Sequence, residues 1–230
     1  MGHPPADLYR ELAITNSDGA DAMYRFDLGN AGNSIRLIYG KNKIDRPTSV
    51  STSRNMWGVF DSLEYGSVTF RAGYQIREAS SQSLITGING AWIKNSDLSL
   101  GASYDPGDWF AMSEWIQRRS TTKVDGMYIS AGRRMDKFIP YLTYSQNSQG
   151  SLLPGFPPPT TASIQYAKRS QNTLSMGVRW DFMKNTDVKL QYDLVKLGDN
   201  SNGYLANVPA NVILYGTRFH VVSAVLDFVF

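Results

Sequence analysis

The chain has 230 residues and a mass of 25.6 kDa, which allows one domain or two. A formal net charge of +3, with no block of five or more Lys or Arg, argues against a nucleic-acid-binding protein. The mean hydropathy of −0.31 would suit a soluble protein, and no apolar run approaches the roughly 18 residues of a transmembrane helix. If this chain spans a membrane, it must therefore do so as a closed β-sheet.

Residues 1–21 form an N-terminal segment that we expect to be a loop, a short helix or an extra strand. The stretch DLYRELAIT (7–15) could supply that strand, whereas Leu8 and Leu12 beside Arg10 and Glu11 would also suit a helix. No positively charged region followed by an apolar stretch is present, so we expect no signal peptide in the chain as given.

From residue 22 onward, apolar and polar residues alternate in runs joined by turn residues, a pattern that predicts β-hairpins. Five hairpins are expected: 22–29 with 33–44, 54–64 with 67–78, 98–105 with 108–119, 124–134 with 137–147, and 174–182 with 188–194.

Longer polar stretches, expected to be loops, separate the hairpins at 45–53, 79–97, 148–168 and 198–217. The third contains Pro154, Pro157, Pro158 and Pro159, which cannot sit inside a sheet because proline lacks a backbone donor. Short turns at one end of the strands and long loops at the other are typical of outer-membrane barrels.

The last expected strand, 219–230, alternates between two faces and ends on an aromatic residue. Phe230, Phe228, Leu226, Ala224 and Val222 share one face because side chains alternate along a strand. Such an end is typical of the closing strand of an outer-membrane β-barrel. With it, 22–230 comprises eleven expected strands, or twelve if the N-terminal segment adds one.

Several of these stretches resemble proteobacterial outer-membrane porins: LSLGASYDPGDWFAMSEW (98–115), GMYISAGRRMDKFIPYLTYS (126–145), VRWDFMKNTDVKLQYDLV (178–195) and the terminal LDFVF. The resemblance implies an all-β, antiparallel transmembrane barrel of 16 strands, of which this chain would be the C-terminal portion. It implies a homotrimer in the Gram-negative outer membrane, touching lipid and lipopolysaccharide and inserted by the barrel-assembly machinery through its last strand. It also implies passive diffusion of small hydrophilic solutes.

If the apolar face is turned outward, the inward face carries most of the charge. The expected pore-lining residues are seven basic and five acidic side chains: Arg25, Asp27, Arg36, Arg71, Arg77, Glu114, Arg118, Arg179, Asp181, Lys189, Asp193 and Asp227. Opposed charges in a narrow lumen select permeants by charge and size, so we expect a weak anion preference. The alternative is that these residues pair as salt bridges in the wall and choose no ions.

Aromatic residues on the outward positions are expected to anchor the barrel at the two membrane interfaces, where amphipathic rings favour headgroup depth. The expected girdle comprises Trp57, Trp109, Trp115, Trp180, Tyr192, Phe228 and Phe230. In a soluble β-sandwich, the less favoured alternative, the same residues would be core.

The sequence gives little support for an enzyme. Only His3 and His220 are present, no G-x-S-x-G motif accompanies them, and Asp181 and Asp193 are better explained as lumen charges. Without cysteine and with two separated histidines, neither a metal nor another cofactor is expected. A non-conducting structural or adhesive barrel remains the alternative from another functional class.

Overall fold

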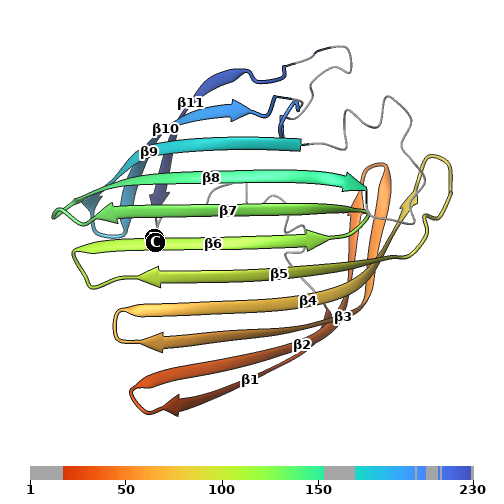
Figure 1. Ribbon diagram of the computed structural model, residues 1–230, viewed down its shortest axis with the longest axis horizontal. Helices are drawn as coiled ribbons and strands as arrows, with labels where there is room; N and C mark the ends of the chain where they lie inside the picture. Colours follow the sequence, from red (N-terminus) through yellow and green to blue (C-terminus); the bar gives the residue numbers. More distant parts are fainter. Residues whose placement is uncertain (1–17, 153–168, 200, 206–211, 213, 229–230) are drawn as a thin grey trace.

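The computed structural model describes residues 18–152, 169–199, 201–205, 212 and 214–228. They form one antiparallel sheet in which each strand pairs with the next along the chain (Figure 1). The strands are β1 (Asp18–Leu28), β2 (Ala31–Arg46), β3 (Ser49–Tyr65), β4 (Val68–Ser83), β5 (Ile93–Tyr104), β6 (Trp109–Arg119), β7 (Thr122–Arg133), β8 (Phe138–Leu152), β9 (Arg169–Met183), β10 (Thr186–Leu197) and β11 (Arg218–Phe228). No helix in these residues is long and apolar enough to cross a membrane.

The five expected hairpins and the final strand are confirmed, and their bounds differ from expectation by a few residues. Strand β1 begins at Asp18, earlier than expected, while the candidate strand 7–15 and the terminal Phe230 lie outside the described residues. The prediction of a loop at 45–53 is wrong. Strand β2 continues to Arg46 and β3 begins at Ser49, so only a two-residue turn separates them.

Two of the short turns show why the strands reverse where they do. Gly29, between β1 and β2, and Gly66, between β3 and β4, both have positive φ angles, of 63° and 56°. Two-residue hairpin turns require that conformation, which glycine adopts without a steric penalty.

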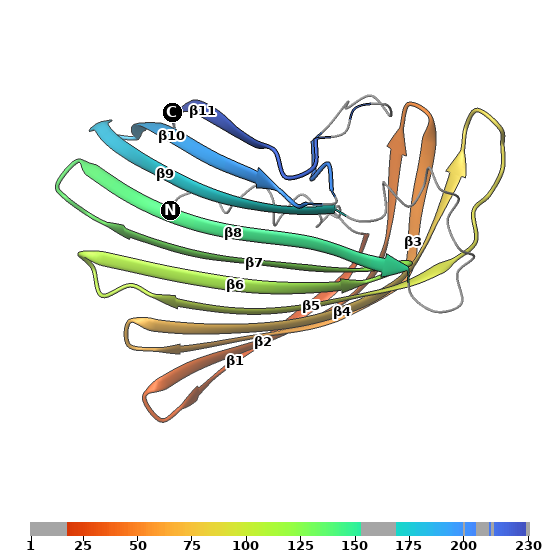
Figure 2. The same cartoon turned by 45° about the horizontal axis from the view of Figure 1, so that its top comes forward.

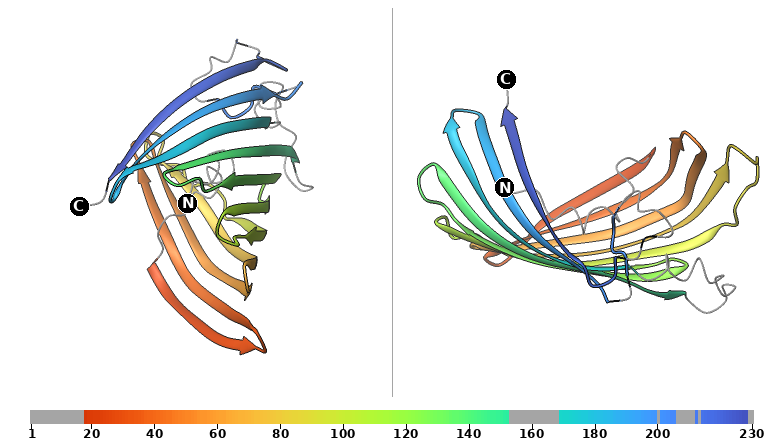
Figure 3. Two further views of the ribbon diagram at one scale, coloured as in Figure 1. Left: turned by 90° about the vertical axis from the view of Figure 1, so that its left-hand side faces the viewer. Right: turned by 90° about the horizontal axis from the view of Figure 1, so that it is seen from above.

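The sheet curves along its whole width into an open trough, as Figures 2 and 3 show from two further directions. Strands β1 and β11 are its two edges, and they do not pair with each other in the described part of the chain. Unlike a flat sheet, this arrangement has a convex and a concave face, and strand pleating assigns alternate residues to each.

Burial is inverted relative to a water-soluble protein. Many large apolar side chains are exposed, among them Leu190, Val222, Leu226 and Phe228 on the convex face. The buried set includes polar residues of the concave face, such as Ser145 and Asn147. The only buried hydrophobic cluster found in the described residues is small, with Ile116 and Tyr128 packed against Met112.

Aromatic rings on the concave face lie over glycines of neighbouring strands. Phe110 is the direct partner of Gly132, and Tyr141 is the direct partner of both Gly132 and Gly177. A Cβ atom at Gly177 would overlap the Tyr141 ring, so the ring uses space that only glycine leaves open. These pairs let bulky rings lie close to the wall, and covering glycines in this way is a known device of β-proteins.

Candidate solute-conducting face

The concave face carries every residue that the sequence predicted to line a pore. A line of direct partners runs from Arg25 through Ser34, Ser62, Arg71 and Gly101 to Glu114, and therefore fixes one common face for these side chains. The registers of the other strands put Asp27, Arg36, Arg77, Arg118, Arg179, Asp181, Lys189, Asp193 and Asp227 on the same face.

Several of these charges are ion-paired. Arg36 Nε donates to Asp21 Oδ2 at 2.7 Å in an exposed pair. Asp97 lies between two arginines, accepting from Arg77 at 2.6 Å and from Arg118 at 2.7 Å, and the three side chains are only 10–12% exposed.

A second network lies at the turn end of the last three strands. Arg179 Nε donates to Asp181 at 2.6 Å and its Nη2 lies 3.3 Å from Asp187. Lys189 Nζ lies 2.5 Å from Asp227 and 3.7 Å from Asp187, and so separates two aspartates that are direct cross-strand partners. Like charges opposite each other repel, so Lys189 stabilises this pairing.

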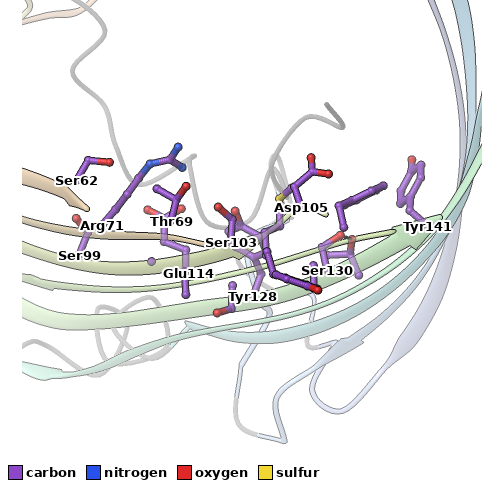
Figure 4. A pocket seen from close by; sticks show the side chains of 18 of the residues that line it. Ser62, Thr69, Arg71, Ser99, Ser103, Asp105, Glu114, Tyr128, Ser130 and Tyr141 are labelled. Atoms are coloured by element: carbon purple, nitrogen blue, oxygen red, sulfur yellow. Dashed lines mark hydrogen bonds between the residues drawn. The ribbon is translucent and has the colours of Figure 1, made fainter. Parts of the chain in front are cut away.

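The middle of the concave face forms a hollow of about 930 Å³ (Figure 4). Its lining combines hydroxyl groups, among them Ser62, Thr69 and Ser99, with the guanidinium of Arg71 and the carboxylate of Glu114. Ser130 and Thr143 hydroxyls share a hydrogen bond of 2.7 Å on the same wall. Hydroxyls and charges on a curved wall are what a water-filled lumen requires.

Part of the connection between β10 and β11 folds onto the concave face. The Tyr204 hydroxyl donates to Asn147 Oδ1 at 2.8 Å, and the Tyr204 backbone N–H donates to Gln171 Oε1 at 3.3 Å. The Ser170 N–H donates to Ser201 Oγ at 2.8 Å, and Ser201 and Tyr204 are both buried. Residues 201–205 therefore reduce the free space beside β8 and β9 at the loop end.

An ion pair also links two turns at the opposite end. Arg134 Nη1 and Nη2 donate to the two carboxylate oxygens of Asp105, each at 2.7 Å. This hydrogen bonding lowers the pKa of Asp105 below its ordinary value and raises that of Arg134. The pair connects the β5–β6 turn to the end of β7.

The residues expected to form the girdle lie on the convex face, except for Phe230, which is outside the described residues. Trp109, Trp180 and Phe228 are exposed near the short turns, and Phe138 stacks on Trp180 with centroids 5.8 Å apart. The other three, Trp57, Trp115 and Tyr192, lie six to eight residues farther along their strands. At about 3.3 Å per residue, Trp115 lies roughly 20 Å from Trp109 along β6, and Tyr192 lies roughly 13 Å beyond Val188, the direct partner of Trp180.

His220 lies on the convex face and shares a hydrogen bond of 2.6 Å with the Tyr192 hydroxyl. Groups of three or more His, Asp or Glu residues able to hold a metal are not found among the residues that the structure describes.

Sequence reasoning missed several charged side chains of the concave face. Asp21, Glu64, Asp97 and Asp187 occupy the concave face by register, as do Arg46 and Arg169. Extending the alternation one or two residues past the expected strand ends would have found Asp97 and Asp187. No sequence signal identifies Tyr204, whose contacts are set by the tertiary structure.

The family model of the Gram-negative porins matches residues 9–200, which is most of the sequence. This chain belongs to the Gram-negative porin family. Its membership confirms the outer-membrane location.

Solved structures agree on the fold. A structure of OmpT from Vibrio cholerae expressed in the outer membrane matches with a TM-score of 0.52 at 11% identity, covering 91% of this chain and 64% of OmpT. An in-vitro folded OmpT of the same organism matches with a TM-score of 0.53 at 12% identity, covering 90% and 63%. The porin chain thus spans less than two thirds of these barrels, and none of the curated proteins matches it.

Proposed function

We propose that this porin chain lines a water-filled channel for the passive diffusion of small hydrophilic solutes and ions, and that it catalyses no reaction. The observation that carries the proposal is the inverted burial: one continuous sheet turns hydroxyl and charged groups to its concave face and large apolar groups to its convex face. An apolar outer band and a polar interior are what a barrel in a bilayer needs.

We also propose a weak anion preference, but with a different origin from the one that the sequence indicated. The additional acidic residues on the concave face remove the basic excess counted from the sequence. The exposed guanidinium of Arg71 in the mid-wall hollow is the remaining support for the preference.

The two sheet edges support a further part of the proposal. Unpaired N–H and C=O groups cannot face hydrocarbon, so β1 and β11 need pairing partners in a bilayer. Together with the partial coverage of the OmpT structures, this supports pairing of the two edges with further strands, and the resemblance to porins sets the proposed total at 16. From family membership we propose a homotrimer in contact with lipid and lipopolysaccharide, with β11 recognised by the assembly machinery.

Ion conductance across a planar bilayer tests the channel. Discrete and stable current steps from the 230-residue chain refolded in detergent would show that it closes a pore by itself or as an oligomer. A salt gradient should then give a reversal potential of the sign expected for weak anion preference. Strand-rich folded protein that never conducts would oppose a channel formed by this chain alone. A cation-selective potential would remove the anion preference while leaving the channel intact.

A further inference from the structure

Arg71 differs from four other arginines of the concave face in having no carboxylate partner. Arg36, Arg77, Arg118 and Arg179 each have a carboxylate oxygen within 3.3 Å. Within the described residues Arg71 makes no ion pair, and its side chain is exposed. Figure 4 shows it rising from the wall, with the guanidinium directed away from the sheet.

The residues around Arg71 are small and carry hydroxyl groups. Its direct partners are Ser62 on β3 and Gly101 on β5, and Thr69 and Gly73 are its same-face neighbours on β4. The diagonal positions on β5 are Ser99 and Ser103. Gly101 leaves space between Arg71 and Glu114, whereas the space above Gly73 is occupied by Ser99 Oγ and the Phe60 ring. Four hydroxyl groups lie on the wall around Arg71 (Figure 4).

One apolar surface adjoins this space. Phe60 is the direct partner of Gly73 and thus a diagonal neighbour of Arg71, at a Cα separation of about 7–8 Å. A Cβ on Gly73 would lie 2.8 Å from Phe60 Cδ1, and one on Gly58 would lie 2.9 Å from Phe60 Cε2. The ring therefore lies low over both glycines and offers apolar surface beside the charge.

We propose that Arg71, the hydroxyls of Ser62 and Ser99, and the Phe60 ring form a binding subsite for small organic carboxylates that carry an apolar group. The planar guanidinium donates two parallel hydrogen bonds to a carboxylate, a geometry that a single arginine satisfies fully. The hydroxyl groups of Ser62 and Ser99 donate hydrogen bonds to the remaining lone pairs of the ligand's carboxylate oxygens, and the apolar group of the ligand packs on the Phe60 ring. The subsite rests on the proposed channel for its supply of solute, whereas binding itself needs no conduction.

Fluorine NMR of the refolded 230-residue chain in detergent tests the subsite directly. Titration of 4-fluorobenzoate should give saturable binding, and Arg71→Gln should weaken it at least about tenfold, a loss of about 1.4 kcal/mol, because the variant lacks the charged guanidinium that donates to the carboxylate. Arg54→Gln is the matched control: it removes the same charge from an exposed pair with Glu78 on the convex face and should change the affinity less than about twofold.

A second variant tests the apolar part of the subsite. Phe60→Leu should weaken 4-fluorobenzoate binding severalfold while leaving binding of fluoroacetate, which lacks a ring, within about twofold. Circular dichroism showing the wild-type strand content in each variant separates lost binding from lost folding.

The results distinguish the subsite from the channel. Arg71-dependent binding by a chain that does not conduct would support the subsite and count against the channel. A chain that conducts but binds 4-fluorobenzoate equally well with and without Arg71, or not at all, would overturn the subsite and leave the channel in place.

Discussion

Replacing Asp97 by asparagine should destabilise the folded sheet more than any other removal of one charge from the concave face. Asp97 neutralises two arginines, Arg77 at 2.6 Å and Arg118 at 2.7 Å, and all three side chains are 10–12% exposed. Asparagine preserves the shape of the side chain but removes its charge. Two largely buried guanidinium groups would then lose the carboxylate that they share.

The size of the effect follows from those distances. At an effective dielectric constant of about 20, each Asp97–arginine pair is attractive by about 6 kcal/mol, and the burial of three charges cancels most of that total. Removing one member of a buried pair typically costs about 3–5 kcal/mol, because the other charge remains desolvated. We therefore expect Asp97→Asn to lower the free energy of unfolding by about 3–5 kcal/mol.

Urea unfolding in detergent micelles, followed by tryptophan fluorescence, measures this difference. Asp21→Asn is the matched control, because its pair with Arg36 is about half exposed and should contribute about 1 kcal/mol or less. If Asp97→Asn were no more destabilising than Asp21→Asn, the buried triad would not have the strength that its geometry indicates.

Three further changes test other parts of the structure. Gly177→Ala should cost about 1–3 kcal/mol in the same unfolding assay, because a Cβ there would displace the Tyr141 ring. The hydrogen bond from Arg134 lowers the pKa of Asp105 in the folded protein. The ionised Asp105 should therefore stabilise the fold fully above its unfolded pKa of about 3.9, and this stabilisation should be lost as the pH falls through the lower folded pKa. Asp105→Asn should therefore be less stable than wild type at pH 7 and equally stable near pH 2. Trp180 fluorescence should be quenched more by lipids brominated close to the headgroup than by lipids brominated at the chain ends.

For each of these three predictions, one outcome would contradict the physical reason given. At Gly150, a Cβ would meet its nearest atom at an ordinary 3.5 Å, so an equal loss from Gly150→Ala would refute the role of the Tyr141 ring. A stability difference at Asp105 that persists unchanged near pH 2 would show that ionisation is not its source. Stronger quenching of Trp180 from the bilayer centre would place it outside an interfacial girdle.

The alternation of side chains made most of the sheet predictable. Leu190, Tyr192 and Leu194 alternate with Lys189, Gln191 and Asp193, and the structure turns the two sets to opposite faces of β10. Because the period of a strand is two residues, one correct assignment fixes every other position in that strand. The twelve charged residues expected to line a pore therefore lie on the concave face by register, and Glu64, inside the expected strand 54–64, was left out of that set.

What sequence reasoning missed lies at strand ends and in tertiary contacts. Polar residues such as Asp45 and Ser51 suggested a loop, yet β2 and β3 remain paired through them, because backbone pairing tolerates polar side chains beyond the apolar band. Asp97 was left out because its strand was expected to begin at Leu98. The contact between Tyr204 and Asn147 joins residues 57 positions apart and follows from no local pattern.

Cysteine labelling in liposomes tests the central claim, that the concave face is wet and the convex face contacts lipid, most directly. The chain contains no cysteine, so single substitutions along β5 report without background. Ser99→Cys and Ser103→Cys should react rapidly with a charged, water-soluble thiol reagent, whereas Leu100→Cys and Ala102→Cys should react at least about tenfold more slowly, because a thiol in lipid is rarely ionised. Equal reactivity at all four positions, or faster reaction at Leu100→Cys and Ala102→Cys, would contradict the assignment of the two faces.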